Sequence, residues 1–132
     1  MQRIVTLMLV MTAFIISAQA SAQEKAKWKE MEEFHTVMAA TFHPSDEGKL
    51  DPIKTRSQEM VDKAVAWQRS SAPKGYDKKA VNSSLKKLVK GSKQLHGMIQ
   101  AKAGDNEIKE KLLSLHDIFH EIMEKCEKED HM

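Results

Sequence analysis

Apolar residues recur at spacings of three and four in four segments of the chain, each about 20 residues long. Because an α-helix has 3.6 residues per turn, this spacing gathers the apolar side chains on one face of a helix. We therefore predict four amphipathic helices, over residues 24–43, 52–70, 78–103 and 106–129. The predicted inward positions are Trp28, Met31, His35, Met38 and Phe42 in the first helix, Ile53, Ser57, Met60, Ala64 and Trp67 in the second, Val81, Leu85, Leu88, Ser92, Leu95 and Ile99 in the third, and Ile108, Leu112, Leu115, Phe119, Ile122 and Cys126 in the fourth.

Capping residues set the predicted helix ends. The first helix is expected to stop just before Pro44, because a residue that precedes proline is biased away from helical backbone. Asp51 followed by Pro52 is typical of an N-cap with proline at the first helical position. Asp77 and Asp105 are expected to cap the third and fourth helices.

The connections between the last three predicted helices are short, which favours helices that alternate in direction. Aromatic residues are only 5% of the chain, and Val, Ile and Thr form no alternating runs, so we expect no strand. The sequence therefore predicts an all-α fold, an antiparallel up-down four-helix bundle. Gly91 and Gly97, inside the third helix, mark either a close approach between helices or a weaker helix.

Residues 1–22 differ in composition from the rest of the chain. Arg3 precedes an apolar run over 4–16, and small residues that fit the A-x-A cleavage pattern follow it. A run of 13 residues is too short to span a bilayer as a helix. We predict a cleaved signal peptide over 1–22 and a single domain over 23–132, with no membrane contact after cleavage.

Export and a single cysteine together favour a bacterial periplasm, because small domains on the eukaryotic secretory route are usually rich in disulfides. Removal of residues 1–22 leaves a formal charge of +1, so the domain is not expected to bind nucleic acid. The third helix is basic and the fourth ends in acidic residues. We interpret these charges as solvated faces, with an acidic protein partner as the alternative for Lys86, Lys87 and Lys90.

Several catalytic and cofactor motifs are missing from the sequence. It has no glycine-rich phosphate loop, no Cys-x-x-Cys-His, no pair of Glu-x-x-His motifs of the di-iron type and no recognisable Ser/His/Asp set. A protein without enzymatic activity is therefore expected.

Three histidines stand out because of where they lie on the predicted helices. His116 and His120 are four residues apart, so their imidazoles lie on one helical face, as in many helical metal sites. A count of 1.5 Å per residue along helices of opposite direction brings His35 to the level of this pair. We predict that the three histidines converge, with Met31 and Met38 as the next candidate ligands.

Three imidazoles suit Cu²⁺ or Zn²⁺, and a thioether sulfur favours Cu⁺. The other histidines and the cysteine are interpreted differently. His43 is taken as a helix-end residue, His96 is left open between a ligand and a structural role, His131 belongs to the tail, and Cys126 is expected to be a buried structural thiol.

The layout resembles the small periplasmic four-helix-bundle cytochromes of the b type and the c-prime type. Met31, within Lys-Glu-Met-Glu-Glu, and His120, within Leu-His-Asp-Ile-Phe-His, match the positions of the Met and His haem ligands of the b type. The resemblance implies a non-covalent haem b with Met31 and His120 as axial ligands. The chain departs from the b-type pattern at His116, where that family tends to carry arginine.

These observations lead to three expectations, in order. The first is a periplasmic bundle that binds Cu or Zn through core histidines, for sequestration or for transfer to a periplasmic protein. The second is a haem b electron carrier. The third is a structural or interaction bundle that binds no ligand.

Overall fold

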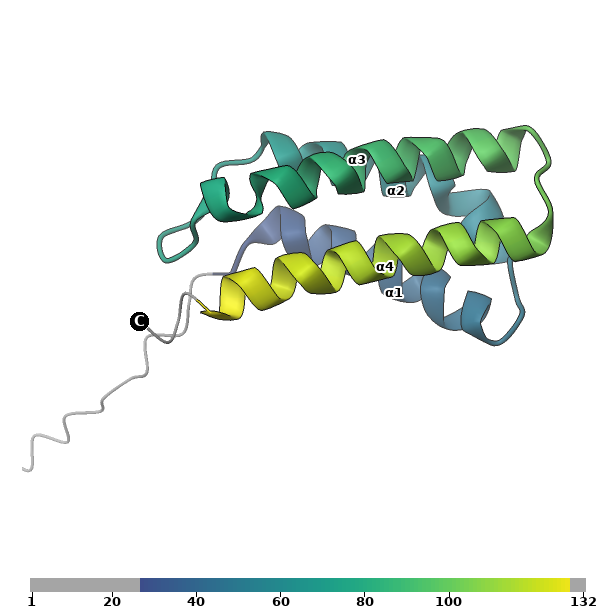
Figure 1. Ribbon diagram of the computed structural model, residues 1–132, viewed down its shortest axis with the longest axis horizontal. Coiled ribbons are helices and arrows are strands. Elements are labelled where there is room, and N and C mark those ends of the chain that lie inside the picture. The colour runs from purple at the N-terminus through teal and green to yellow at the C-terminus, as the bar shows by residue number, and fades with distance from the viewer. Residues whose placement is uncertain (1–26, 129–132) are drawn as a thin grey trace, which may run out of the picture.

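Four helices account for most of the computed structural model, which describes residues 27–128 and only the backbone of 127 and 128. They are α1 (Lys29–Asp46), α2 (Asp51–Arg69), α3 (Lys78–Gln100) and α4 (Asp105–Lys128), as Figure 1 shows. No strand occurs within the described range, so the predicted all-α, four-helix class is confirmed. The predicted signal peptide, the first residues of the predicted first helix and His131 lie outside the described residues.

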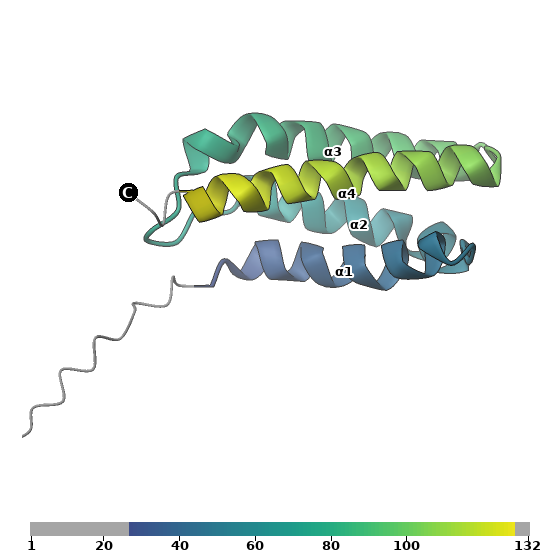
Figure 2. The same cartoon turned by 60° about the horizontal axis from the view of Figure 1, so that its bottom comes forward.

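The four helices surround one core. Each helix packs against the next in the chain, and α1 also touches α4, with fewer close contacts than the other three neighbouring pairs. α1 does not contact α3, and Figure 2 shows α2 and α4 between these two helices. Over residues 27–128, no helix is long and apolar enough to cross a membrane.

The inward faces of α2, α3 and α4 follow the predicted spacing. Every predicted inward residue of α2 and α4 is buried, and so are those of α3 except Ile99, which is half-buried. The buried cluster includes Cys126, as expected. The predicted cap at Asp77 is confirmed by a hydrogen bond from the Lys79 backbone N–H to its side chain at 2.9 Å. Asp51 is instead the first residue of α2, and Leu50 occupies the cap position.

The inward face of α1 differs from the prediction. Phe34, Val37 and Thr41 are buried, whereas Phe42 is half-buried and His35 is exposed. Two overlapping stripes with the same spacing exist along this helix. Phe34, Val37 and Thr41 of the second stripe face the core together with Trp28, Met31 and Met38 of the predicted one. The expectation that His35 occupies a core position is therefore wrong, and the helix turns His35 towards the edge that faces α4.

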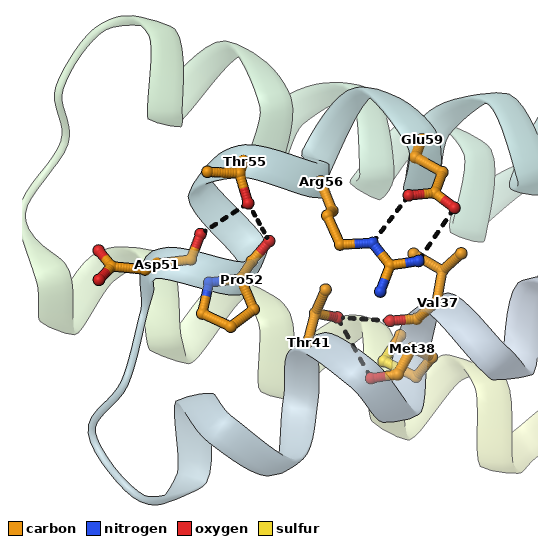
Figure 3. A network of polar contacts seen from close by, with 8 residues as sticks. All are labelled: Val37, Met38, Thr41, Asp51, Pro52, Thr55, Arg56 and Glu59. Carbon is orange, nitrogen blue, oxygen red and sulfur yellow. Dashed lines mark hydrogen bonds and ion pairs between the residues drawn. The ribbon is translucent and has the colours of Figure 1, made fainter.

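The predicted end of α1 at Pro44 is also wrong, because the helix continues to Asp46 with Pro44 inside it. A proline so close to the end removes only one intrahelical hydrogen bond. The turn closes beyond it, where the backbone N–H of Lys49 donates to Pro44 at 2.8 Å. One turn earlier, the buried Thr41 hydroxyl donates to the carbonyls of Val37 and Met38 (Figure 3).

The polar contacts in Figure 3 lie mostly within single helices. The Thr55 hydroxyl donates to backbone carbonyls of the first turn of α2. Arg56 holds Glu59 through two hydrogen bonds of 2.8 and 3.0 Å, which lowers the pKa of the Glu59 carboxyl. Both side chains are partly exposed, so this pair adds little to the stability of the fold.

The two glycines inside α3 have different surroundings. A Cβ added to Gly91 would lie 2.5 Å from Cδ2 of Leu115 on α4, whereas one added to Gly97 would meet nothing within 4 Å. Gly91 therefore marks the close approach of α3 and α4, and Gly97 does not.

Candidate metal site between α1 and α4

A small pocket lies between α1 and α4, and four histidines line it. His35 and His43 come from α1, and His116 and His120 come from α4. The other lining residues are Met38, Ala39, Phe42 and Phe119. We call this the histidine pocket. Its volume is about 50 Å³, enough for an ion and a few waters but far below the roughly 300–1,000 Å³ of small-molecule sites.

The closest polar contact in the pocket joins the two histidines of α4. Nε2 of His116 and Nε2 of His120 are hydrogen bonded at 3.1 Å, one ring donating and the other accepting, and the two rings are nearly perpendicular, at 74°. The residues are four apart, so they lie on the same face of α4, one turn apart. Two nitrogens that bind one ion at about 2.0–2.1 Å lie about 3.1 Å apart when the angle at the ion is near 100°.

Aromatic rings hold the histidines in place. The ring of His116 stacks on Phe42 of α1, with centroids 3.8 Å apart and planes within 6°. The ring of His35 stacks on Phe119 of α4 at 5.2 Å. Each stack pairs a ring of α1 with a ring of α4. The aromatic rings that contact the imidazoles therefore also pack α1 against α4.

The surroundings of His116 favour its neutral form. Burial lowers the pKa of its imidazole, and the nearby His120 and His43 lower it further. Asp117 and Asp46 act in the opposite direction and are outweighed. A neutral imidazole has a free lone pair, so the lowered pKa leaves His116 able to bind a cation at neutral pH.

The structure brings most of the predicted ligands to the histidine pocket. His35, His116 and His120 line it, and so does Met38, which is buried. Met31 is also buried but is not among the lining residues. The histidines lie at the surface between two helices rather than in the core, because His35 and His120 are exposed and His116 is partly buried.

The fourth histidine of the pocket, His43, was expected to be only a helix-end residue. His43 lies inside α1, as predicted, and lines the pocket together with Ala39 and Phe42. The sequence held this signal as the helical spacing of four and eight residues from His35 through Ala39 to His43.

Two other candidates lie elsewhere. His96 of α3 is hydrogen bonded through Nδ1 to the Ser57 hydroxyl of α2 at 2.8 Å, so its role is to join two helices. Cys126 lies in the core. Within residues 27–128, no three His, Cys, Asp or Glu side chains converge closely enough to hold a metal ion as they stand. The arrangement offers two converging nitrogens and two further imidazoles on the pocket wall.

No protein-family model matches the chain, and no curated protein or solved structure matches it.

Proposed function

We propose that this protein is an exported, non-enzymatic four-helix bundle that binds a transition-metal ion at the histidine pocket, for sequestration or transfer. The observation that carries the proposal is the 3.1 Å separation of the Nε2 atoms of His116 and His120, in a pocket whose opposite wall supplies His35 and His43. This separation matches two cis ligands on one ion. The ligand set proposed is therefore His116 and His120, completed by an imidazole of α1 and by water.

Copper is the preferred ion in this proposal, and zinc is the second. Neutral imidazoles suit both ions, but the thioether of Met38 lines the same pocket and favours Cu⁺. Structural zinc sites have four protein ligands and are closed, whereas two convergent ligands leave open positions. An open site exchanges its ion readily, which favours sequestration or transfer over a structural role.

A bare ion is favoured over haem b. The haem alternative requires Met31 and His120 to face one cavity, and Met31 packs in the core away from the pocket that His120 lines. The pocket volume of about 50 Å³ suits an ion far better than a macrocycle.

The proposal also includes the cellular setting and the direction of the helices. An antiparallel up-down arrangement is supported by the connections between consecutive helices, which lie at alternate ends of the bundle in Figure 1. Removal of residues 1–22 and a periplasmic location are proposed on the apolar run over 4–16 and the small residues after it.

Equilibrium titration with Cu²⁺, Cu⁺ and Zn²⁺ tests the proposal. We expect one ion per chain, and at least a tenfold to 100-fold loss of affinity in His116→Ala and in His120→Ala, since even indirect supports of a metal ligand are worth that much. The matched control is His96→Ala, which removes an imidazole that lies outside the pocket. Unchanged affinity in both α4 variants would rule out the site, and a Soret band in the exported protein would favour haem.

A further inference from the structure

Helix α3 has the largest net positive charge of the four helices. Helix α3 contains six lysines and no Asp or Glu, whereas α1 contains a single lysine and four acidic residues. Five of the α3 lysines are exposed, and we call them the lysine face: Lys79, Lys86, Lys87, Lys90 and Lys93. At 100° per residue, all but Lys87 project within an arc of about 60°, and they extend about 21 Å along the helix.

Nothing in the described fold neutralises this face. Lys86, Lys87, Lys90 and Lys93 form no ion pair with another residue of the part that the structure describes. Like charges three and four residues apart destabilise a helix, so the fold itself gains nothing from this arrangement. The face therefore has the properties of a surface for a polyanion.

The composition of the lysine face indicates what kind of polyanion it fits. Protein interfaces are enriched in aromatic residues, Met and Arg and are depleted in Lys. The exposed positions of α3 hold Lys, Ser, Asn, Gln and small residues, and the large exposed apolar residue of the described chain, Leu113, is on α4. A face of flexible ammonium groups without an apolar anchor suits a continuous anionic surface, where binding depends on charge and not on shape.

We propose that the lysine face of α3 binds the protein to an anionic lipid bilayer through the phosphate headgroups, a surface contact that replaces the sequence-based expectation of no membrane contact. The geometry keeps the histidine pocket accessible in the bound state. Because α1 does not contact α3 and lies across the bundle from it (Figure 2), the α1 wall of the pocket is turned away from a surface that α3 covers. This inference stands independently of which ion the pocket binds.

Vesicle co-sedimentation tests the inference, with the protein as the cell processes it and its N-terminus read by mass spectrometry. The probe is vesicles of phosphatidylcholine with about one third phosphatidylglycerol, at low ionic strength, where the Debye length exceeds about 10 Å. We expect binding that salt reverses, and little binding to pure phosphatidylcholine. Each lysine near an anionic surface is worth about fivefold, so the triple variant K86Q/K87Q/K90Q should bind roughly 100-fold more weakly.

The matched control removes three exposed lysines from other elements, in the triple variant K29Q/K49Q/K109Q. It has the same net charge as the α3 variant, and we expect it to keep most of the binding. Equal losses in both variants, or no binding at low salt, would overturn the inference. Binding to an acidic protein without binding to vesicles would overturn it too. Circular dichroism verifies that both variants fold, and metal titration of the α3 variant separates a failure here from a failure of the pocket.

Discussion

Two tryptophans that pack against each other in the core differ in a single polar contact. Trp28 and Trp67 are both fully buried, with ring centroids 6.0 Å apart. Nε1 of Trp28 donates to the Ser70 hydroxyl at 2.8 Å, whereas Nε1 of Trp67 is buried and has no hydrogen-bond partner within residues 27–128. A buried donor without a partner destabilises a fold by about 1–3 kcal/mol. The two indoles therefore offer a direct comparison between a satisfied and an unsatisfied buried donor.

Both tryptophans lose comparable ring area when they are replaced by phenylalanine. We expect Trp28→Phe to be more destabilising than Trp67→Phe by about 1–3 kcal/mol, because only the first substitution breaks a hydrogen bond and only the second removes an unpaired donor. Urea unfolding of the two variants measures the difference. An equal or larger loss in Trp67→Phe would mean that its indole has a partner in solution.

The lowered pKa of His116 predicts how the stability of the metal-free protein depends on pH. The group is neutral in the fold at a pH where the unfolded chain, with an ordinary pKa of 6.5, already binds a proton. The unfolded state thus binds more protons in this interval, so stability is full above pH 6.5 and declines as the pH falls through 6.5 towards the lower folded pKa.

Urea midpoints measured from pH 7.5 to pH 5 check this expectation, with His116→Gln as the comparison. The variant should lose less stability over this range, because it has no imidazole at this position to charge. NMR titration of the His116 ring gives the pKa directly, and a value at or above 6.5 would contradict the proposed effect of burial.

At the scale of the helices, the two glycines of α3 separate helix propensity from helix packing. Gly97→Ala should stabilise the protein by about 0.5–1 kcal/mol, since the new methyl group meets nothing and alanine favours the helix. Gly91→Ala has the same gain in propensity but displaces the fully buried Leu115, which costs about 1–3 kcal/mol. Thermal unfolding of both variants should therefore show opposite shifts, and a rise of equal size in both would disprove the close approach.

The sequence was sufficient to predict α2, α3 and α4 to within a few residues, because each has one apolar stripe and a clear break at either end. It was insufficient for α1, where the stripe through Phe34 and Thr41 competes with the stripe through His35 and Phe42 at the same spacing. Only the packing of the Phe34 ring against Trp67 and Phe119 distinguishes them. That choice moves His35 from the core to the edge.

The sequence likewise predicted only the part of the candidate site that depends on a single helix. The spacing on α4 placed His116 and His120 together, since it depends on one helix alone. The place of His43 in the pocket depends on how α1 packs against α4, which the sequence of α1 alone does not fix. Met31, the residue that matched the Met ligand of the cytochromes, is buried as predicted but does not line the pocket.

For the molecule as a whole, an ion in the histidine pocket would join α1 and α4, which have fewer close contacts than the other neighbouring pairs of helices. An ion that binds only the folded state stabilises it by about 2.7 kcal/mol at a free concentration 100 times Kd. For a domain of this size, we expect an increase in Tm of about 10 °C with Cu²⁺ or Zn²⁺.

The increase in Tm should disappear in the double variant His116→Ala/His120→Ala and persist in His96→Ala. Each sample is compared with the same protein in the presence of a chelator. Differential scanning calorimetry is the measurement. A Tm that does not change with either ion in the unmodified protein would contradict binding in the histidine pocket.

The histidine pocket joins the first helix to the last, and this has a consequence for how the protein is made. A chain that is synthesised from its N-terminus contains His35 and His43 before His116 and His120 are made. Until α4 has folded, the imidazoles of α1 have no histidines opposite them in the pocket. An ion that takes ligands from both α1 and α4 can therefore bind only after the bundle has folded. In the proposed function, metal binding would thus also indicate that folding is complete.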